Sequence, residues 1–101
     1  MAQKQPRVRT LNVNYRKGAG GTRISKEMYD AVKKAILAAV PRNREGVLFR
    51  ELPAEVKRRA PQALFQHASV SWYTTTDKLD LEARRLIERV PGSNPQRLRR
   101  R

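Results

Sequence analysis

Three observations predict an α+β fold, mainly α, for this chain of 101 residues: three helices with a small antiparallel sheet, preceded by a basic N-terminal arm or hairpin. Apolar residues recur at steps of three and four between Lys26 and Ala39, as on one face of a helix. Residues from Val70 to about Arg85 contain no Pro or Gly, which favours another long helix. Near the C-terminus, a Pro-Gly-Ser-Asn-Pro turn separates two short runs that can pair as strands. A chain of this length has room for one small domain with a modest core.

The N-terminal stretch, residues 1–24, is expected to be a basic flexible arm with a possible short hairpin. Residues 1–9 are polar, basic and unpatterned, which is typical of a disordered segment. Apolar and polar residues alternate from Thr10 to Asn14, which predicts a short strand, and residues 22–24 are a candidate return strand. The glycine-rich turn between them lacks the spacing of a phosphate-binding loop, so we interpret it only as a turn.

The remaining stretch, residues 25–101, is expected to form the folded domain. Its first helix begins after the N-cap Ser25 and stops before Pro41. A short apolar run at 47–49 predicts a small strand, and a second helix is expected from Arg50 to about Ala60. The connection over residues 61–68 is long enough to contain one helical turn.

The third helix, after the N-cap Ser69, carries apolar residues on two opposite faces. At about 100° per residue, Trp72 and Leu79 share one face, whereas Leu81 lies near the opposite one. Two assignments of the buried face therefore stay open, although Trp72 taken alone is expected in the core. A helix with two apolar faces is typical of packing between two layers, and the second layer is either the N-terminal hairpin or another subunit.

The C-terminal region resembles a known family. The run from Leu81 to Arg89 (LEARRLIER) resembles the recurrent Leu-Glu-x-x-Gly-Leu-Ile-x-Arg ending of winged helix-turn-helix proteins of bacteria and archaea. In that family a recognition helix runs into the first strand of a wing, which here implies a hairpin of residues 86–90 and 96–99. The resemblance covers roughly residues 25–101, and from Thr10 onward the chain is similar to a set of small uncharacterised bacterial proteins.

One position departs from the family pattern. Arg85 stands where the family has Gly. Glycine there adopts a left-handed conformation that ends the helix. The resemblance therefore implies either a left-handed Arg85 or a different helix exit.

Charge is concentrated at the two ends of the chain. The formal net charge is +14, from 23 Lys and Arg against 9 Asp and Glu. Residues 1–26 hold seven cations and residues 90–101 hold four, and neither stretch contains an acid. Arginine predominates over lysine, which favours bidentate contacts with phosphate or guanine edges. Two basic arms suit a polyanion, because neutralised phosphates release counterions; a pair of solubilising tails is the alternative.

The candidate nucleic-acid contacts fall into three groups: arm, third helix and wing. They are Arg7, Arg9, Arg16, Lys17 and Arg23 in the arm, Ser71, Thr74, Thr75, Lys78 and Arg85 in the helix, and Arg97, Arg99 and Arg100 in the wing. Hydroxyls at a helix N-terminus suit contacts to phosphates and thymine methyls. Asp77, Asp80 and Glu82 oppose deep insertion of this helix, because carboxylates repel phosphates.

The wing is the stronger candidate. On a strand, Arg97 and Arg99 share the face opposite Leu98, so they can reach a minor groove or a backbone together.

No catalytic constellation is found, so the chain is not expected to be an enzyme, and no cofactor or metal is expected. His67 is the single histidine and there is no cysteine. Asp77 and Asp80 form a carboxylate pair, but nearby Lys78 and Arg84 make surface ion pairs the favoured interpretation. The absence of cysteine, of a signal-like segment and of an apolar run near ~20 residues predicts a cytoplasmic protein, nucleoid-associated if it binds DNA.

The function best supported by the sequence is DNA binding by a small basic winged-helix regulator or architectural protein. Duplex DNA would be gripped by the arginine-rich wing and the arm. One alternative is an RNA- or ribosome-associated protein, although no exposed aromatic platform is expected that would favour single strands. The other is a winged-helix protein–protein adaptor with an exposed Trp72 or Leu81 face. A membrane partner is not expected, and a homodimer stays open.

Overall fold

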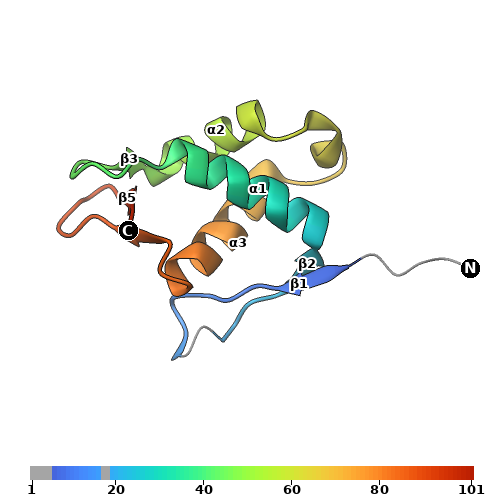
Figure 1. Cartoon of the computed structure of the whole chain (residues 1–101), viewed down its shortest axis with the longest axis horizontal. Helices are drawn as coiled ribbons and strands as arrows, with labels where there is room; N and C mark the ends of the chain where they lie inside the picture. Colours follow the sequence, from blue (N-terminus) through green and yellow to red (C-terminus); the bar gives the residue numbers. More distant parts are fainter. Residues whose placement is uncertain (1–5, 17–18) are drawn as a thin grey trace, which may run out of the picture.

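The computed structural model describes residues 6–16 and 19–101, and over these it has an α+β fold with three α-helices and two small antiparallel sheets (Figure 1). The helices are α1 (Lys26–Ala39), α2 (Leu52–Arg59) and α3 (Val70–Ala83). The strands are β1 (Arg7–Arg9) and β2 (Arg23–Ser25) in one sheet, and β3 (Val47–Leu48), β4 (Ile87–Arg89) and β5 (Arg97–Arg100) in the other. Two 3-10 turns, η2 (Phe49–Glu51) and η3 (Gln62–Phe65), flank α2. The predicted α+β class is confirmed.

Helix α1 has the predicted span and supplies one wall of the core. The Ser25 hydroxyl accepts a hydrogen bond from the Met28 N–H at 3.1 Å, which caps its first turn. The fully buried core side chains come from all three helices and the larger sheet: Val32, Ile36, Leu52, Val56, Leu81, Ile87 and Leu98. Each buried aliphatic side chain contributes about 1.5–3 kcal/mol relative to exposure.

The second helix is shorter than predicted. The stretch expected to be helical from Arg50 begins as the 3-10 turn η2, and the α-helix starts only at Leu52. Pro53 lies in its first turn, where the missing N–H is not needed. The helical turn expected between Pro61 and Ala68 is present as η3. None of the helices in the described part of the chain is long and apolar enough to span a membrane.

The three-stranded sheet has the order β3-β5-β4. Leu98 at the centre of β5 lies opposite Val47 on one side and Arg89 on the other. The short apolar strand and the C-terminal strand pair predicted from the sequence are therefore confirmed. Because Leu98 and Ile87 are buried, the inner face of this sheet closes the core. Side chains that alternate with Leu98 along β5 lie on the outer face.

Helix α3 ends in a left-handed arginine, the first of the two exits that the sequence allows. Arg85 has φ +63°. It is the residue at which the winged-helix ending that the sequence resembles has Gly. Its N–H donates to the Glu82 carbonyl and the Leu86 N–H donates to the Leu81 carbonyl, both at 3.0 Å. These two bonds form a Schellman motif, which satisfies carbonyls at the helix end. The motif turns the chain from α3 directly into β4.

The strand expected at Thr10–Asn14 is wrong: the strand lies earlier, at β1, in a stretch expected to be disordered. Val8 pairs with Ile24 in the β1–β2 ribbon. After β1 the chain runs along α3, where the Val13 N–H donates to the Leu79 carbonyl at 3.3 Å. Alternation alone could not locate the strand, because its register is set by the burial of Ile24 on its partner strand and by the packing of the ribbon against α1.

Candidate nucleic-acid interface

Helix α3 lies between two layers, as its two apolar faces indicate. Leu81 is fully buried against the core, whereas Trp72 is 48% exposed, so the expectation of a core Trp72 is wrong. On the other side the Leu11 N–H donates to the Asp80 carboxylate at 2.8 Å. The N-terminal segment is therefore the second layer, and it covers part of the helix that was expected to face nucleic acid.

Asp80 is the centre of the first buried charge cluster of α3. Its carboxylate accepts hydrogen bonds from the Tyr29 hydroxyl at 2.5 Å and from the Arg84 Nε at 2.9 and 3.0 Å. Burial, together with the bond to Asp80, raises the pKa of Tyr29 well above its usual range. The same carboxylate raises the pKa of Arg84. Asp80 thus ties α1 and the N-terminal segment to α3, and it is not a surface residue.

Lys78 and Glu82 form the second buried cluster. The Lys78 Nζ lies 2.6 Å from Glu82 Oε1, and the Arg89 Nε lies 2.6 Å from Glu82 Oε2. The Lys78 ammonium also lies 4.6 Å from the centre of the Phe49 ring. Burial lowers the pKa of Lys78, and the ion pair with Glu82 opposes that shift.

Burial in and around these clusters shows that two of the predicted nucleic-acid contacts are wrong. Thr74 and Lys78 are 0% and 3% exposed, so neither side chain reaches the surface. The reason is that α1, the sheet and the N-terminal segment all pack around α3, which leaves it one narrow exposed strip. Asp77, Asp80 and Glu82 are buried as well, so their expected repulsion of phosphates does not apply.

Asp77 is a buried carboxyl group without a partner. It is 0% exposed, and within residues 6–16 and 19–101 neither of its oxygens forms a hydrogen bond. Burial raises the pKa of Asp77 to about 8, and the nearby Asp80 and Asp30 carboxylates act in the same direction, while Lys33 opposes them. The group is therefore mostly protonated at neutral pH, which adds to the excess of positive charge.

The outer face of the three-stranded sheet gathers arginines around a single carboxylate. Glu88 lies opposite Arg99, and its Oε2 is 2.6 Å from the Arg99 Nε. The Arg101 Nε lies 3.4 Å from the other oxygen of Glu88. Arg97, two residues before Arg99 on β5, lies on the same face opposite Leu48.

The loop between α1 and β3 extends this surface. The Arg42 Nη1 donates to the Arg101 carbonyl at 3.1 Å, and the Arg99 Nη1 contacts the Arg44 carbonyl at 3.5 Å. We call the surface formed by Arg42, Arg44, Arg97, Arg99 and Arg101 the arginine face. Sequence reasoning missed its two loop arginines and Arg101. The available signal was that the basic loop directly precedes the strand expected to join the wing.

The other predicted contacts do not join the arginine face. Arg100 alternates with Arg99 and so lies on the Leu98 side of β5. Arg7, Arg9 and Arg23 are exposed on the β1–β2 ribbon, which lies toward the opposite end of the molecule from β5 (Figure 1). Ser71, Thr75 and Arg85 are exposed at α3, Arg16 is exposed in the turn, and Lys17 lies outside the described residues. The arm and the wing are therefore two separate basic surfaces.

Comparison with known proteins gives a family without an assigned role. One family model, described as a family of unknown function (DUF6958), matches residues 7–98. No curated protein and no solved structure gives a significant match. The matched residues run from the first residue of β1 to Leu98, the second residue of β5, so all three helices and every strand except the last two residues of β5 lie within the family pattern. The chain therefore belongs to the family of unknown function DUF6958.

Proposed function

We propose that this protein is a small basic nucleic-acid-binding protein of winged-helix architecture that grips the backbone of duplex DNA through its arginine face. The order α1, β3, α2, α3, β4, β5 and the sheet order β3-β5-β4 support the architecture. So does the LEARRLIER ending, which runs from α3 through the left-handed Arg85 into β4. In this proposal β4, β5 and the turn between them are the wing.

The observation that carries the proposal is the excess of guanidinium groups on the arginine face. Glu88 is shared by Arg99 and Arg101, and Arg97 takes part in no ion pair within the described residues. Guanidinium groups bind phosphate oxygens in a bidentate manner and stay charged at any physiological pH. Three of the nine acids are buried in α3, so they do not offset this surface.

Helix α3 has a smaller part in the proposal than the family resemblance implies. The bonds from Leu11 and Val13 hold the N-terminal segment along the helix, which obstructs a deep approach to a major groove. Ser71 and Thr75 stay exposed and can contact phosphates near the helix N-terminus. Binding is therefore expected to depend on the backbone more than on base sequence.

The test is fluorescence anisotropy of a labelled mixed-sequence DNA duplex, titrated at several salt concentrations with the wild type and with Arg97→Ala/Arg99→Ala. Each phosphate contact contributes about 0.9 to the slope of log K against log salt. We expect a steep negative slope for the wild type that becomes shallower by about two units in the double variant.

The matched control is Arg58→Ala/Arg59→Ala, which removes the same charge from α2, where both arginines pair with Glu55. If net charge alone caused binding, both double variants would lose affinity equally. An unchanged slope for the Arg97/Arg99 variant, or no binding at low salt, would overturn the proposal. A structured RNA competitor that displaces the duplex at equal phosphate concentration would assign the face to RNA instead.

A further inference from the structure

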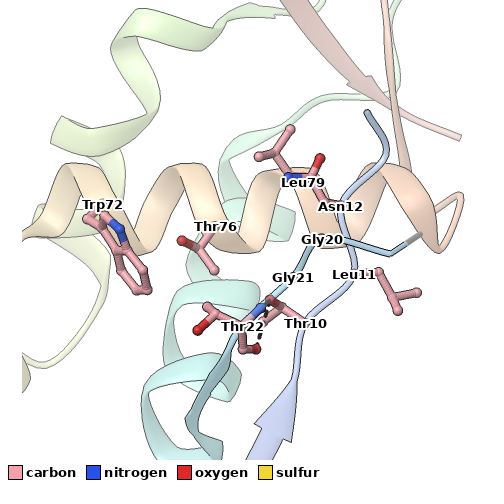
Figure 2. A pocket seen from close by; sticks show the side chains of 9 residues that line it. All are labelled: Thr10, Leu11, Asn12, Gly20, Gly21, Thr22, Trp72, Thr76 and Leu79. Carbon is pink, nitrogen blue, oxygen red and sulfur yellow. Dashed lines mark hydrogen bonds between the residues drawn. The ribbon is translucent and has the colours of Figure 1, made fainter. Parts of the chain in front are cut away.

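A cavity of about 190 Å³ lies between α3 and the N-terminal segment (Figure 2). Trp72 and Thr76 project into it from the same side of α3, and Thr10, Asn12 and the backbone of Gly21 line the opposite wall. Its volume is below the ~300–1,000 Å³ that drug-sized ligands occupy. It therefore has room for one small ring system rather than for a peptide or a large cofactor.

The lining combines an aromatic face with uncharged polar groups. Among the described residues, no charged side chain lines the cavity. Thr76 and Asn12 contribute a hydroxyl and an amide, each able to donate and accept hydrogen bonds. The Thr10 hydroxyl is already used, because it donates to the Thr22 carbonyl and accepts from the Thr22 N–H. A neutral flat heterocycle with polar edges matches this combination.

The aromatic groups at the cavity are exposed yet held in place. Trp72 packs edge-to-face on Tyr73 with ring centres 4.9 Å apart, and Tyr73 packs in the same way on Phe65 at 6.5 Å. Tyr15, 57% exposed, packs its ring against Gly20, where a Cβ would lie only 2.5 Å from the ring. Trp72 thus lines the cavity as a solvent-exposed aromatic side chain, and exposed Tyr15 packs on Gly20 of the lining, which corrects the expectation that no aromatic platform is exposed.

A pair of like charges stands beside the cavity. Arg9 and Arg23 are directly opposite each other in the β1–β2 ribbon, one residue along the chain from the cavity residues Thr10 and Thr22. Because side chains alternate along a strand, the two arginines extend from the other face of the ribbon. Both are exposed, and neither is in an ion pair within the described part of the chain. Like charges directly opposite on a ribbon are destabilising. A bound phosphate would relieve that repulsion.

We infer that the cavity holds an unpaired nucleobase of a nucleic-acid strand, stacked on Trp72, and that the backbone of the strand continues past the edge of the β1–β2 ribbon to Arg9 and Arg23. The inference deepens the proposed function by naming the form of nucleic acid that this end of the molecule takes. Stacking on an aromatic side chain tolerates any base, and hydrogen bonds from Asn12 and Thr76 then meet the base edge.

Trp72 is the single tryptophan, so its fluorescence reports the cavity directly. Short oligo(dT) and oligo(U) would be titrated against the full chain, beside a blunt duplex and free thymidine monophosphate at equal phosphate concentration. We expect saturable quenching by the single strands, little by the duplex, and none by the free nucleotide at that concentration. In anisotropy, Trp72→Ala is expected to weaken single-strand binding about 5- to 100-fold and Trp72→Phe much less.

Two further double variants distinguish single-strand binding at the cavity from duplex binding at the arginine face. Arg9→Ala/Arg23→Ala should weaken single-strand quenching, whereas Arg97→Ala/Arg99→Ala should leave quenching intact and impair only duplex binding. Circular dichroism of Trp72→Ala checks its fold, and Trp72→Phe retains an aromatic ring if the alanine variant unfolds. No quenching by either strand at low salt, or equal strand affinity of folded Trp72→Ala and the wild type, would overturn the inference. Equal quenching by the free nucleotide would overturn the assignment to a strand.

Discussion

Charged side chains surround helix α3 and cover the arginine face, but the two regions use them in opposite ways. Around α3 the charges are matched: Lys78 and Arg89 meet Glu82, and Arg84 meets Asp80. On the arginine face Glu88 pairs with two of the five arginines, Arg99 and Arg101. The loop carboxylate Glu45 lines a pocket with Arg97, so five arginines stand against two carboxylates. In the first region Lys78 and the two carboxylates are buried and every cation has a carboxylate partner, although the Arg84 and Arg89 side chains are 39% and 42% exposed. In the second region the cations outnumber the carboxylates, so it keeps its excess charge.

The difference teaches which charges are available to a ligand. A cation that is buried and already paired with a carboxylate is not available to bind phosphate. Separating such a pair is unfavourable, because it leaves an uncompensated charge in the protein interior. Unmatched surface arginines have lost little hydration and can exchange counterions for phosphates. Counting basic residues along the sequence therefore overestimates the role of α3 and misses the loop that holds Arg42 and Arg44.

The largest expected effect on the free energy of unfolding comes from breaking a buried ion pair of α3. Glu82→Gln would leave Lys78, 3% exposed, without its carboxylate, and removing one partner of a buried pair costs about 3–5 kcal/mol. Urea unfolding followed by circular dichroism measures this loss. The control is Glu55→Gln, whose carboxylate pairs with Arg58 and Arg59 on the surface of α2, and its midpoint should stay near that of the wild type. Equal losses in the two variants would mean that burial does not distinguish the two kinds of pair.

A second, smaller effect concerns the one buried carboxyl of α3 that has no partner. The pKa of Asp77 is about 8 in the folded protein and near 3.8 when the chain is unfolded. Between these values the folded state binds a proton that the unfolded state lacks, so stability falls as pH rises from about 3.8 to about 8 and levels off above that. From about pH 7 to about pH 9 the wild type should lose about 1.4 kcal/mol from this group.

Asp77→Asn should remove that loss, because the amide does not titrate. The measurement is the unfolding free energy of both proteins from urea titrations across this pH range, and the comparison cancels contributions from other groups. Parallel pH profiles would show that Asp77 is ionised in the folded state and has a partner. In that case Asp77 would belong with Asp80 and Glu82, the carboxylates of α3 that are paired with cations.

Local sequence signals predicted the three helices and the strands of the larger sheet but not β1, and long-range contacts decided the rest. Caps and prolines fixed α1, and the alternation around Leu98 fixed β5, because each depends on residues close in the chain. The pairs Lys78–Glu82 and Asp80–Arg84 also have the readable i, i+4 spacing, yet the spacing alone predicts a surface. Their burial also depends on partners 7, 51 and 69 residues away, beyond the reach of the i, i+4 pattern.

The smallest expected effect comes from removing a carboxylate of the arginine face instead of its arginines. Glu88→Gln removes the carboxylate that binds both Arg99 and Arg101, so these two guanidinium groups become free for phosphate. Partly exposed ion pairs are weak, so duplex affinity at low salt should rise only about two- to fivefold, with the fold unchanged. Anisotropy titrations measure the gain, and Glu55→Gln, which removes the same charge from α2, should give less. If both variants gain equally, net charge rather than the arginine face sets the affinity. If Glu88→Gln weakens binding, the carboxylate orients the arginines instead of competing with phosphate, and the face works as an organised site.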